Sequence, residues 1–452
     1  MSESRLSIPG PARSFFATII VFLQILFKPY KALQMFRDKY GDPFVIRMFG
    51  MGNVVTTGRP ELVKAMFAVP PANFSMAMTP LLEFFFGKRS LFITEGTTHR
   101  GDKSIVIPYF CGHQLHSYGD IITQLTVEKC EKRLGKESFS LMELAQDITL
   151  EVLMRSQLGL TDRTHIEKIR TLFENLNECQ SPLLGLHIFR HNFLGFGPWA
   201  KFHRYNTPLR EYLRGLIREY RSREEPGQDI LSLLAHARQE NGEFLLEVEP
   251  ICDHLFTLLV AGFDTTANSV TWTLELIHRH PEVLNKILEE LDNLPPDAPA
   301  NDLTTLPWLD ATCYEVLRLR PPVETLPIRK LKKAMDLDGH TLPAGTGICP
   351  SPILTHMNPD LYPNPEQFDP ERFLGRKPTP FEFITFGGGV RLCAGWAFAH
   401  YQMRLILGTC LRHFQFEVQG EYPVPKRYSV VIAPRGDTPA SLSPRPKSAQ
   451  ST

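Results

Sequence analysis

The chain has 452 residues, of which 43% are hydrophobic and 22% charged, and its 49 Lys and Arg balance 49 Asp and Glu. This composition is typical of a globular protein, and it argues against nucleic acid as a partner because there is no basic excess. The length is sufficient for a large buried core. The eight cysteines lack CxxC pairs or regular spacing, which favours reduced thiols in a cytoplasmic protein over a disulfide framework.

The N-terminal segment opens with IPGP at residues 8–11 and continues into the only long apolar run, FFATIIVFLQILF, at residues 15–27. A helix of that length is too short to span a membrane, which takes roughly 20 apolar residues. The sequence after it has no small-residue cleavage site, so we do not expect a signal peptide. We expect residues 1–28 to carry an apolar helix docked on the body, with at most peripheral membrane contact.

The chain from residue 29 to 437 predicts one domain that is mainly α-helical with a small β-sheet region. Residues 43–57 and 335–348 show the alternation and the turn residues of hairpins, whereas most of residues 115–320 has the pattern of helices. The last segment is rich in Ser and Pro, which predicts a disordered tail over residues 438–452.

The longest predicted helix covers about residues 250–280 and would be roughly 45 Å long at 1.5 Å per residue. AGFDTT, at residues 261–266, interrupts its apolar sequence. Gly and Thr weaken a helix locally, because Gly has a poor helix propensity and Thr hydroxyls compete for backbone carbonyls. Buried polar groups need partners or a purpose, so the middle of this helix is a candidate functional site.

Two short patterns follow that helix. YEVLRLRPP places Glu315 and Arg318 three residues apart on one helical face, a spacing that is common in solvated ion pairs of little energetic value. FDPERF, at residues 368–373, contains Arg372, whose guanidinium could form a bidentate pair with a buried carboxylate. Neither pattern is diagnostic by itself.

The glycine-rich stretch FGGGVRLCAG, at residues 386–395, lies directly before a long helical run. Glycines allow the backbone to bring its N–H groups close to a bound group. Cys393 stands near the start of the helix, where the dipole and free N–H groups stabilise a thiolate, the form of cysteine that binds metals. Taken alone, a buried core cysteine beside a turn is the more common case.

These four patterns in this order, AGFDTT, ExxR, PERF and FxxGxRxCxG, resemble the signature motifs of the haem-thiolate cytochrome P-450 monooxygenases, with closest likeness to the soluble bacterial type. The resemblance extends from the IPGP opening through YGDPF at residues 40–44 to the end of the last long helix. It implies the cytochrome P-450 fold, with haem b between the long distal helix and the helix of the cysteine loop. It also implies an enzyme that inserts one atom of O2 into its substrate.

The resemblance makes Cys393 the axial ligand of the haem iron, with Phe386 and the glycine-rich backbone, including Gly395, beside its sulfur. Four basic residues would meet the haem propionates: His99, Lys103, Arg329 and Arg391. Lys103 departs from the commoner arginine and lacks its bidentate fork. Gln402 departs from the glutamate that many members carry nine positions after the ligand.

On the opposite side of the haem, Asp264 and Thr265 resemble the family's acid and alcohol pair, in which the hydroxyl holds dioxygen and a water while the carboxylate helps to deliver protons. Glu315, Arg318 and Arg372 would form a buried network behind the haem. Breaking that network would leave an unpaired buried charge.

The resemblance also places substrate contacts in several variable segments, where the candidates are Phe85, Val260, Ala261, Leu326 and Val431. Residues 71–93 are rich in Phe, Met and Leu, which suits an apolar pocket but equally suits a packed core. We expect a small apolar substrate, a fatty acid or a terpenoid. Because no reductase domain follows the cysteine loop, electrons from NAD(P)H would arrive through a separate ferredoxin or flavodoxin with its reductase.

Three alternatives stay open. The protein could be a peroxide-dependent hydroxylase or an isomerase without external electrons, although Asp264 and Thr265 argue for dioxygen activation. It could instead bind haem as a sensor or carrier without turnover, in which case apolar ligands would not shift the iron spin state. A haem-free relic would have a damaged cysteine motif, and the motif here is intact.

Overall fold

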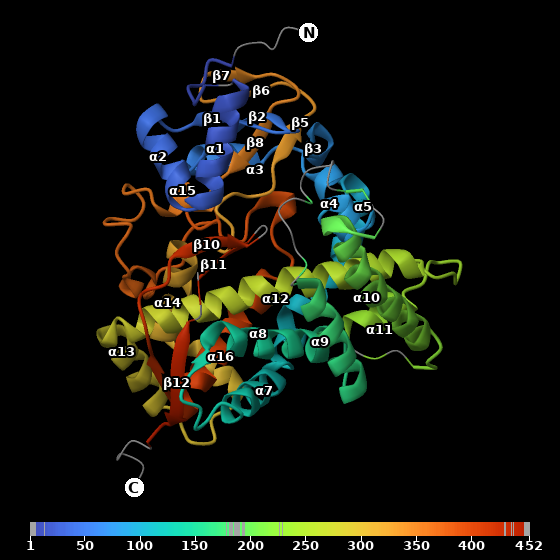
Figure 1. The fold of residues 1–452 in the computed structure, drawn as a ribbon, viewed down its shortest axis with the longest axis vertical. Helices are drawn as coiled ribbons and strands as arrows, with labels where there is room; N and C mark the ends of the chain where they lie inside the picture. Colours follow the sequence, from blue (N-terminus) through green and yellow to red (C-terminus); the bar gives the residue numbers. More distant parts are fainter. Residues whose placement is uncertain are drawn as a thin grey trace.

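The structure, a computed structural model, describes residues 6–12, 14–177, 179, 184, 190–191, 195–225, 227, 229–428, 431–434, 436 and 438–446, without the side chains of Leu81 and His113. The described chain is mainly α-helical with small β-sheets, which confirms the predicted fold class (Figure 1). The N-terminal helices lie with the larger sheet at one end of the molecule, and the other helices form the body.

The described helices, in chain order, are α1 (Phe15–Phe27), α2 (Lys31–Tyr40), α3 (Pro60–Phe67), α4 (Thr79–Phe86), α5 (Gly96–Val106), α6 (Gly112–His116), α7 (Gly119–Glu131), α8 (Leu141–Val152), α9 (Arg163–Asn177), α10 (Gly197–Arg221), α11 (Ile230–His236), α12 (Val248–His278), α13 (Pro281–Asp292), α14 (Pro307–Leu319), α15 (Pro352–His356) and α16 (Trp396–His413). Short helical turns that bear on the site are η3 (Leu153–Gln157), η7 (Pro370–Phe373) and η8 (Gly389–Arg391).

The five-stranded sheet joins segments that are far apart in the sequence. Its strand order is β1 (Phe44–Met48), β2 (Gly52–Thr57), β8 (Gly347–Pro350), β5 (Arg329–Leu331) and β3 (Phe74–Met76). The predicted hairpin at residues 43–57 is the antiparallel pair of β1 and β2, and β2 pairs in parallel with β8. The second predicted hairpin is confirmed as β6 (Met335–Leu337) with β7 (His340–Leu342).

The prediction of a disordered tail over residues 438–452 is wrong for the residues of β12 (Pro439–Pro444). This strand lies between β9 (Phe414–Val418) and β4 (Phe139–Ser140) in a three-stranded sheet. Ala440 and Leu442 are buried, while the serines between and after them are more exposed. That period of two is a strand pattern that the Ser and Pro composition concealed. Residues 447–452 lie outside the described residues.

The long predicted helix is α12, which crosses the body of the molecule (Figure 1). It contacts α8, α10, α14 and α16, so it is surrounded by other helices along most of its length. This position explains why its sequence is apolar on nearly every face. Gly262 allows one close approach, because a Cβ there would lie 2.9 Å from a methyl carbon of Leu153 in η3.

The predicted apolar helix of residues 15–27 is α1, and it begins where the Ser14 hydroxyl accepts a hydrogen bond from the N–H of Ala17. It is docked on α2, β1 and strand β10 (Pro425–Tyr428), which pairs with β11 (Val431–Pro434). Within the described residues, we find no helix with the length and hydropathy needed to cross a membrane.

Candidate active site

The cysteine loop is closed by its own backbone. The N–H of Cys393 donates to the carbonyl of Phe386 at 2.9 Å, and α16 begins three residues later at Trp396. Cys393 is exposed, although protein atoms lie close enough around its thiol to affect the thiol pKa. All eight cysteines are free thiols, in agreement with the absence of a disulfide pattern in the sequence.

The three glycines of this loop are required by its geometry. Gly387 and Gly389 have φ values of 73° and 60°, in the left-handed region that other residues rarely adopt. Gly388 lies against α3, where an added Cβ would be 2.3 Å from the ring of Phe67. Any side chain at this position would push the loop away from α3.

The electrostatic surroundings of Cys393 differ from the expectation of a stabilised thiolate. Burial raises the pKa of the thiol, and it outweighs the N–H of Gly395 and the charge of Lys103, which both lower that pKa. The folded chain by itself therefore favours the thiol. A metal cation bound to the sulfur would supply the charge that ionises it.

Helix α5 brings His99 and Lys103 to the cysteine loop. The Lys103 ammonium donates to the carbonyls of Val390 and Leu392, at 3.2 and 2.5 Å. His99 is buried, and its pKa falls to about 3 because of burial and the positive charges of Arg391 and Lys103. His99 is therefore neutral at physiological pH and can donate one hydrogen bond.

The two predicted arginines reach the same region from other elements. Arg329 lies on β5, is buried, and donates to the carbonyls of Met66 and Gly388 at 3.0 Å each. Burial and the nearby charge of Arg391 lower the pKa of Arg329 to about 10. Arg391 donates to two carbonyls within residues 91–94, at 3.1 and 2.6 Å.

These cations outnumber the acids beside them: the Glu95 carboxylate lines the same cavity, and its charge raises the pKa of Arg391. Among the described residues, Lys103, Arg329 and Arg391 form hydrogen bonds to carbonyl groups but no ion pair with a carboxylate. Lys103, Arg391 and His99 line a cavity of about 290 Å³ beside the loop, and Arg329 reaches that loop through Gly388. Three cations against this one carboxylate leave an excess of positive charge, so the cluster fits an anionic ligand that carries carboxylates.

The middle of α12 presents Asp264 and Thr265 to different surroundings. The Thr265 hydroxyl donates to the Ala261 carbonyl at 2.7 Å, which leaves its oxygen free to accept. Asp264 instead accepts hydrogen bonds from Gln146 of α8, at 3.3 Å, and from Asn177 of α9. Burial raises the pKa of Asp264 to about 6, although both hydrogen bonds lower it.

No pattern in the sequence indicated the amide partners of Asp264. Gln146 precedes Asp264 by 118 residues, so only the packing of α8 against α12 brings them together. Both partners are neutral amides, and neither supplies a positive charge. Desolvation therefore has the largest effect on the pKa of the carboxyl group.

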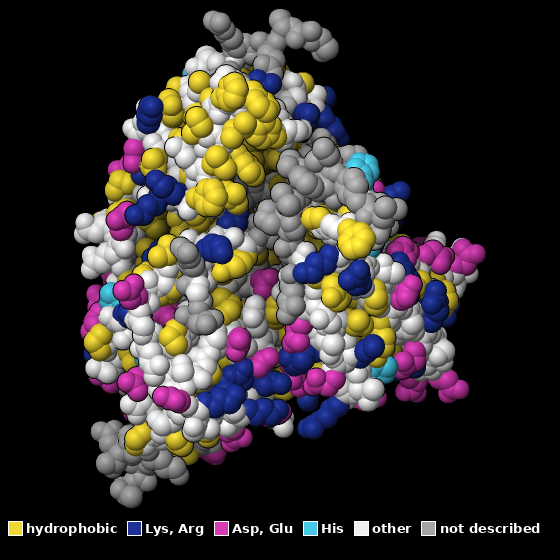
Figure 2. Space-filling view, viewed as in Figure 1, with side chains coloured by type: hydrophobic (Ala, Val, Ile, Leu, Met, Phe, Trp, Pro, Cys, Tyr) yellow, Lys and Arg dark blue, Asp and Glu magenta, His cyan; other side chains and the backbone are white. Residues whose placement is uncertain are grey.

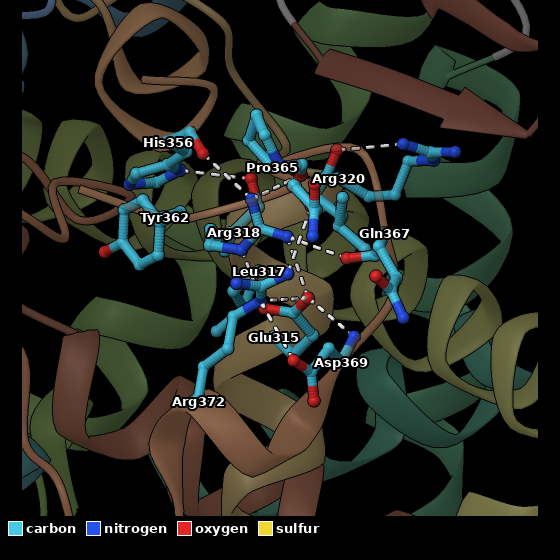
Figure 3. Close-up of polar contacts among 12 residues, drawn as sticks. Glu315, Leu317, Arg318, Arg320, His356, Tyr362, Pro365, Gln367, Asp369 and Arg372 are labelled. Carbon is cyan, nitrogen blue, oxygen red and sulfur yellow. Dashed lines mark hydrogen bonds and ion pairs between the residues drawn. The ribbon is translucent and has the colours of Figure 1, made fainter. Parts of the chain in front are cut away.

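The ExxR pattern forms a buried ion pair (Figure 3). Arg318 binds both carboxylate oxygens of Glu315 at 2.7 Å, and neither side chain is exposed. The same guanidinium donates to three backbone carbonyls at 2.7 to 3.2 Å: those of His356, Pro365 and Gln367. This pair is therefore not the solvated one that such spacing usually indicates.

Arg372 does not form the bidentate pair that its motif predicted. Its Nε lies 3.6 Å from a Glu315 oxygen, and its two terminal nitrogens donate to the carbonyls of residues 363 and 364. The Asp369 N–H donates to Oε1 of Glu315 at 2.9 Å. Arg318 occupies the bidentate position because it is on the same helical face as Glu315, one turn away.

His356 extends this network toward the cysteine loop, a role that the sequence did not indicate. Its Nε2 accepts from the Ile384 N–H at 3.1 Å, so Nδ1 carries the proton and donates to the Arg318 carbonyl, also at 3.1 Å. The Thr385 hydroxyl donates to the Leu317 carbonyl at 3.0 Å. The residues just before Phe386 are thus fixed to the end of α14.

The candidate substrate residues are dispersed. Phe85 packs among aromatic rings, with centroids 5.6 Å from Phe202 of α10 and 5.3 Å from Phe256 of α12. Leu326 is buried in a small cluster with Phe67 beneath the glycine loop. The other candidates are partly buried: Val260, Ala261 and Val431. Substrate contact by all five residues stays a prediction.

Comparison with known proteins gives a consistent result. A family model described as Cytochrome P-450 matches residues 9–438. Cytochrome P-450 135B1 of Mycobacterium tuberculosis is 30% identical over 94% of this chain and 89% of its own length, and cytochrome P-450 138 of the same organism is 29% identical over 86% and 85%.

Two solved structures share the fold. The cytochrome P-450DA haem domain superposes with a TM-score of 0.84 and 22% identity, over 98% of this chain and 99% of that one. The cyanobacterial protein CYP120A1, solved with retinoic acid bound, gives a TM-score of 0.79 and 24% identity, over 90% and 93%.

The buried ion pair predicts a large effect of Arg318→Leu. The substitution leaves the Glu315 carboxylate without its principal cation, so the free energy of unfolding should fall by about 3–5 kcal/mol, measured by urea unfolding. Arg214→Leu is the control, since Arg214 pairs with the half-exposed Glu249 and its loss should cost about 1 kcal/mol or less. Equal losses in both variants would contradict a structural role for the pair.

The raised pKa of Asp264 predicts a pH-dependent cost in stability. The pKa of Asp264 is about 6 in the folded protein against 3.8 for the free group, so the folded protein holds this proton more tightly than the unfolded chain. The stability that results is complete below pH 3.8 and is lost as the pH rises through 6. The cost at pH 7 is about 3 kcal/mol. Asp264→Asn should therefore be more stable than the wild type at pH 7 and lose that advantage toward pH 4, in urea unfolding across this range. A pH-independent difference would show that the carboxyl group is not desolvated.

Proposed function

The chain belongs to the cytochrome P-450 family and is a haem monooxygenase, and from this premise we propose the roles of its own residues. The observation that carries the proposal is the cluster of Lys103, Arg329 and Arg391 at the Cys393 loop, three cations that form no ion pair with a carboxylate in the described part of the chain and outnumber the nearby Glu95. Haem b carries two propionates and an iron, so it matches both the cations and the thiol. When bound, it supplies the iron on which dioxygen is activated.

On the proximal side we assign Cys393 as the residue whose sulfur would bind the haem iron. The N–H of Gly395 would donate a hydrogen bond to the sulfur and moderate its electron donation, and Phe386 would pack beside it. Arg329, Arg391 and neutral His99 would donate to the propionates. Lys103 has a further role, because two of its three protons already hold the loop carbonyls on either side of Arg391.

On the distal side we assign Thr265 and Asp264 to proton delivery. Since the Thr265 hydroxyl donates to Ala261, its oxygen can accept a hydrogen bond from an ordered water and hold that water for proton transfer. Asp264, with a pKa of about 6, can take up and release protons close to neutral pH. The overall reaction joins RH, O2, two protons and two electrons to give ROH and water.

We propose a small apolar substrate, a fatty acid or a terpenoid. The aromatic side chains of α4 that pack on α10 and α12 support an apolar environment on this side of α12. The electrons would come from NAD(P)H through a ferredoxin or flavodoxin with its reductase. Eight free cysteines support a reducing, cytoplasmic location.

Thr265→Ala tests the distal assignment. Loss of the hydroxyl should leave substrate binding unchanged but lower the share of NAD(P)H electrons recovered in product by at least about tenfold, with a matching rise in hydrogen peroxide. The assay combines a surrogate ferredoxin and reductase with an apolar ligand chosen by its shift of the iron spin state. Thr273→Ala is the matched control, because Thr273 makes the same hydroxyl-to-carbonyl bond two turns further along α12.

Full coupling in Thr265→Ala would contradict the assigned role of the acid and alcohol pair. Product formed from peroxide alone, without electrons from NAD(P)H, would identify a peroxide-dependent hydroxylase. If no apolar ligand shifts the spin state and no product forms, the protein is a haem-binding sensor or carrier.

A further inference from the structure

Helix α1 presents its most apolar side chains to solvent. Its 13 residues include no charged residue, and only Thr18 and Val21 are buried. Phe16 and Phe27 are 77% and 74% exposed, and four further large apolar side chains of the helix are also exposed: Phe15, Ile20, Phe22 and Leu23. A helix on the surface of a soluble protein normally has the reverse arrangement.

The exposed residues continue onto the hairpin of β1 and β2. Phe49, in the turn of that hairpin, has its ring 5.7 Å from that of Phe15 and 6.5 Å from that of Phe22. We call these residues together the α1 face: Phe15, Phe16, Ile20, Phe22, Leu23, Phe27 and Phe49. Figure 2 shows hydrophobic side chains gathered at the end of the molecule where Figure 1 labels α1 and β1. A contiguous patch of this kind marks an interaction surface.

The border of the α1 face is basic. Lys28 and Lys31 directly follow the helix, are exposed, and form no ion pair among the described residues. The two acids within residues 14–58 are already engaged: Asp38 pairs with the preceding arginine, and Asp42 accepts from the N–H of Gly58 at 2.9 Å. The surface around α1 therefore combines an uncharged apolar centre with positive charge at its edge.

We propose that the α1 face binds the surface of an anionic lipid membrane, with α1 lying in the plane of the headgroups. At 1.5 Å per residue the helix is roughly 20 Å long, too short to span a bilayer. Lipid is the occupant that this chemistry favours, because acyl chains take up apolar side chains without complementary shape and anionic headgroups attract lysines at the edge. The proposal does not depend on the assigned roles of the haem-site residues.

Sedimentation of the haem-containing protein with vesicles tests this directly. We expect binding to phosphatidylcholine vesicles with about 30% phosphatidylglycerol, weaker binding to pure phosphatidylcholine, and a further decrease as salt rises. The double variant Phe16→Ser with Phe27→Ser should bind both kinds of vesicle at least about tenfold more weakly. The double variant Lys28→Glu with Lys31→Glu should lose about tenfold or more on the anionic vesicles only.

Leu245→Ser is the matched control, because Leu245 is an apolar side chain outside the α1 face and is 42% exposed. It should bind vesicles as the wild type does. Circular dichroism and the haem absorption spectrum would show that each variant is folded. If the Phe double variant fails to fold, vesicle binding by the Lys double variant and by the single variant Phe16→Ser decides the question.

Absence of binding to anionic vesicles, or equal binding by all variants, would overturn the proposal. Light scattering tests the alternative, in which a second copy of the chain occupies the α1 face. If the wild type forms a dimer that Phe16→Ser with Phe27→Ser dissociates, and neither protein binds vesicles, the α1 face is a contact between two copies of the chain and not a membrane surface.

Discussion

The position of the cysteine loop depends on one buried guanidinium. Arg318 has no exposed surface, and it binds the Glu315 carboxylate together with three backbone carbonyls from residues 356–367. A buried charge is tolerated only when such partners are in place, so the irregular segment that supplies the carbonyls must fold around it. His356 and Thr385 then connect this centre to the backbone just before the loop. The ion pair on α14 therefore helps to determine where the thiol lies.

From the other side, three cations tie the same loop to its surroundings: Lys103 and Arg329 donate to loop carbonyls, and Arg391 donates from the loop to carbonyls within residues 91–94. Lys103, Arg391 and Arg329 come from α5, from the loop itself and from β5, elements that are far apart in sequence. Burial lowers the pKa of each group, and the charge of Arg391 lowers it further for Lys103 and for Arg329, whose pKa is about 10. A ligand that carries carboxylates would offset this excess of positive charge and so stabilise the folded chain by binding. Burial of Cys393 acts in the same direction, because a metal bound to the sulfur would offset the cost of its charge.

Local patterns in the sequence were sufficient to predict α1, α12, the two hairpins and the position of the cysteine loop, since each depends on residues that are close in the chain. The partners of Asp264 and the bridging role of His356 could not be predicted, because packing joins segments such as α8 and α12 that are separated by about a hundred residues. Composition led to the wrong prediction of disorder for β12, because its alternation of buried and exposed residues lies within a Ser- and Pro-rich segment. Arg372 shows a related limit, since Arg318 already binds both oxygens of Glu315, and that competition depends on the tertiary structure.

The central claim is that Cys393 binds the haem iron through its sulfur. The measurement that tests it most directly is the absorption spectrum of the reduced protein with carbon monoxide, compared between the wild type, Cys393→Ser and Cys111→Ser. Cys111 is the other exposed cysteine and provides the control. A strongly red-shifted Soret band in the wild type and in Cys111→Ser, absent in Cys393→Ser, is the predicted result. A protein that takes up no haem, or a red-shifted band that survives in Cys393→Ser, would contradict the account.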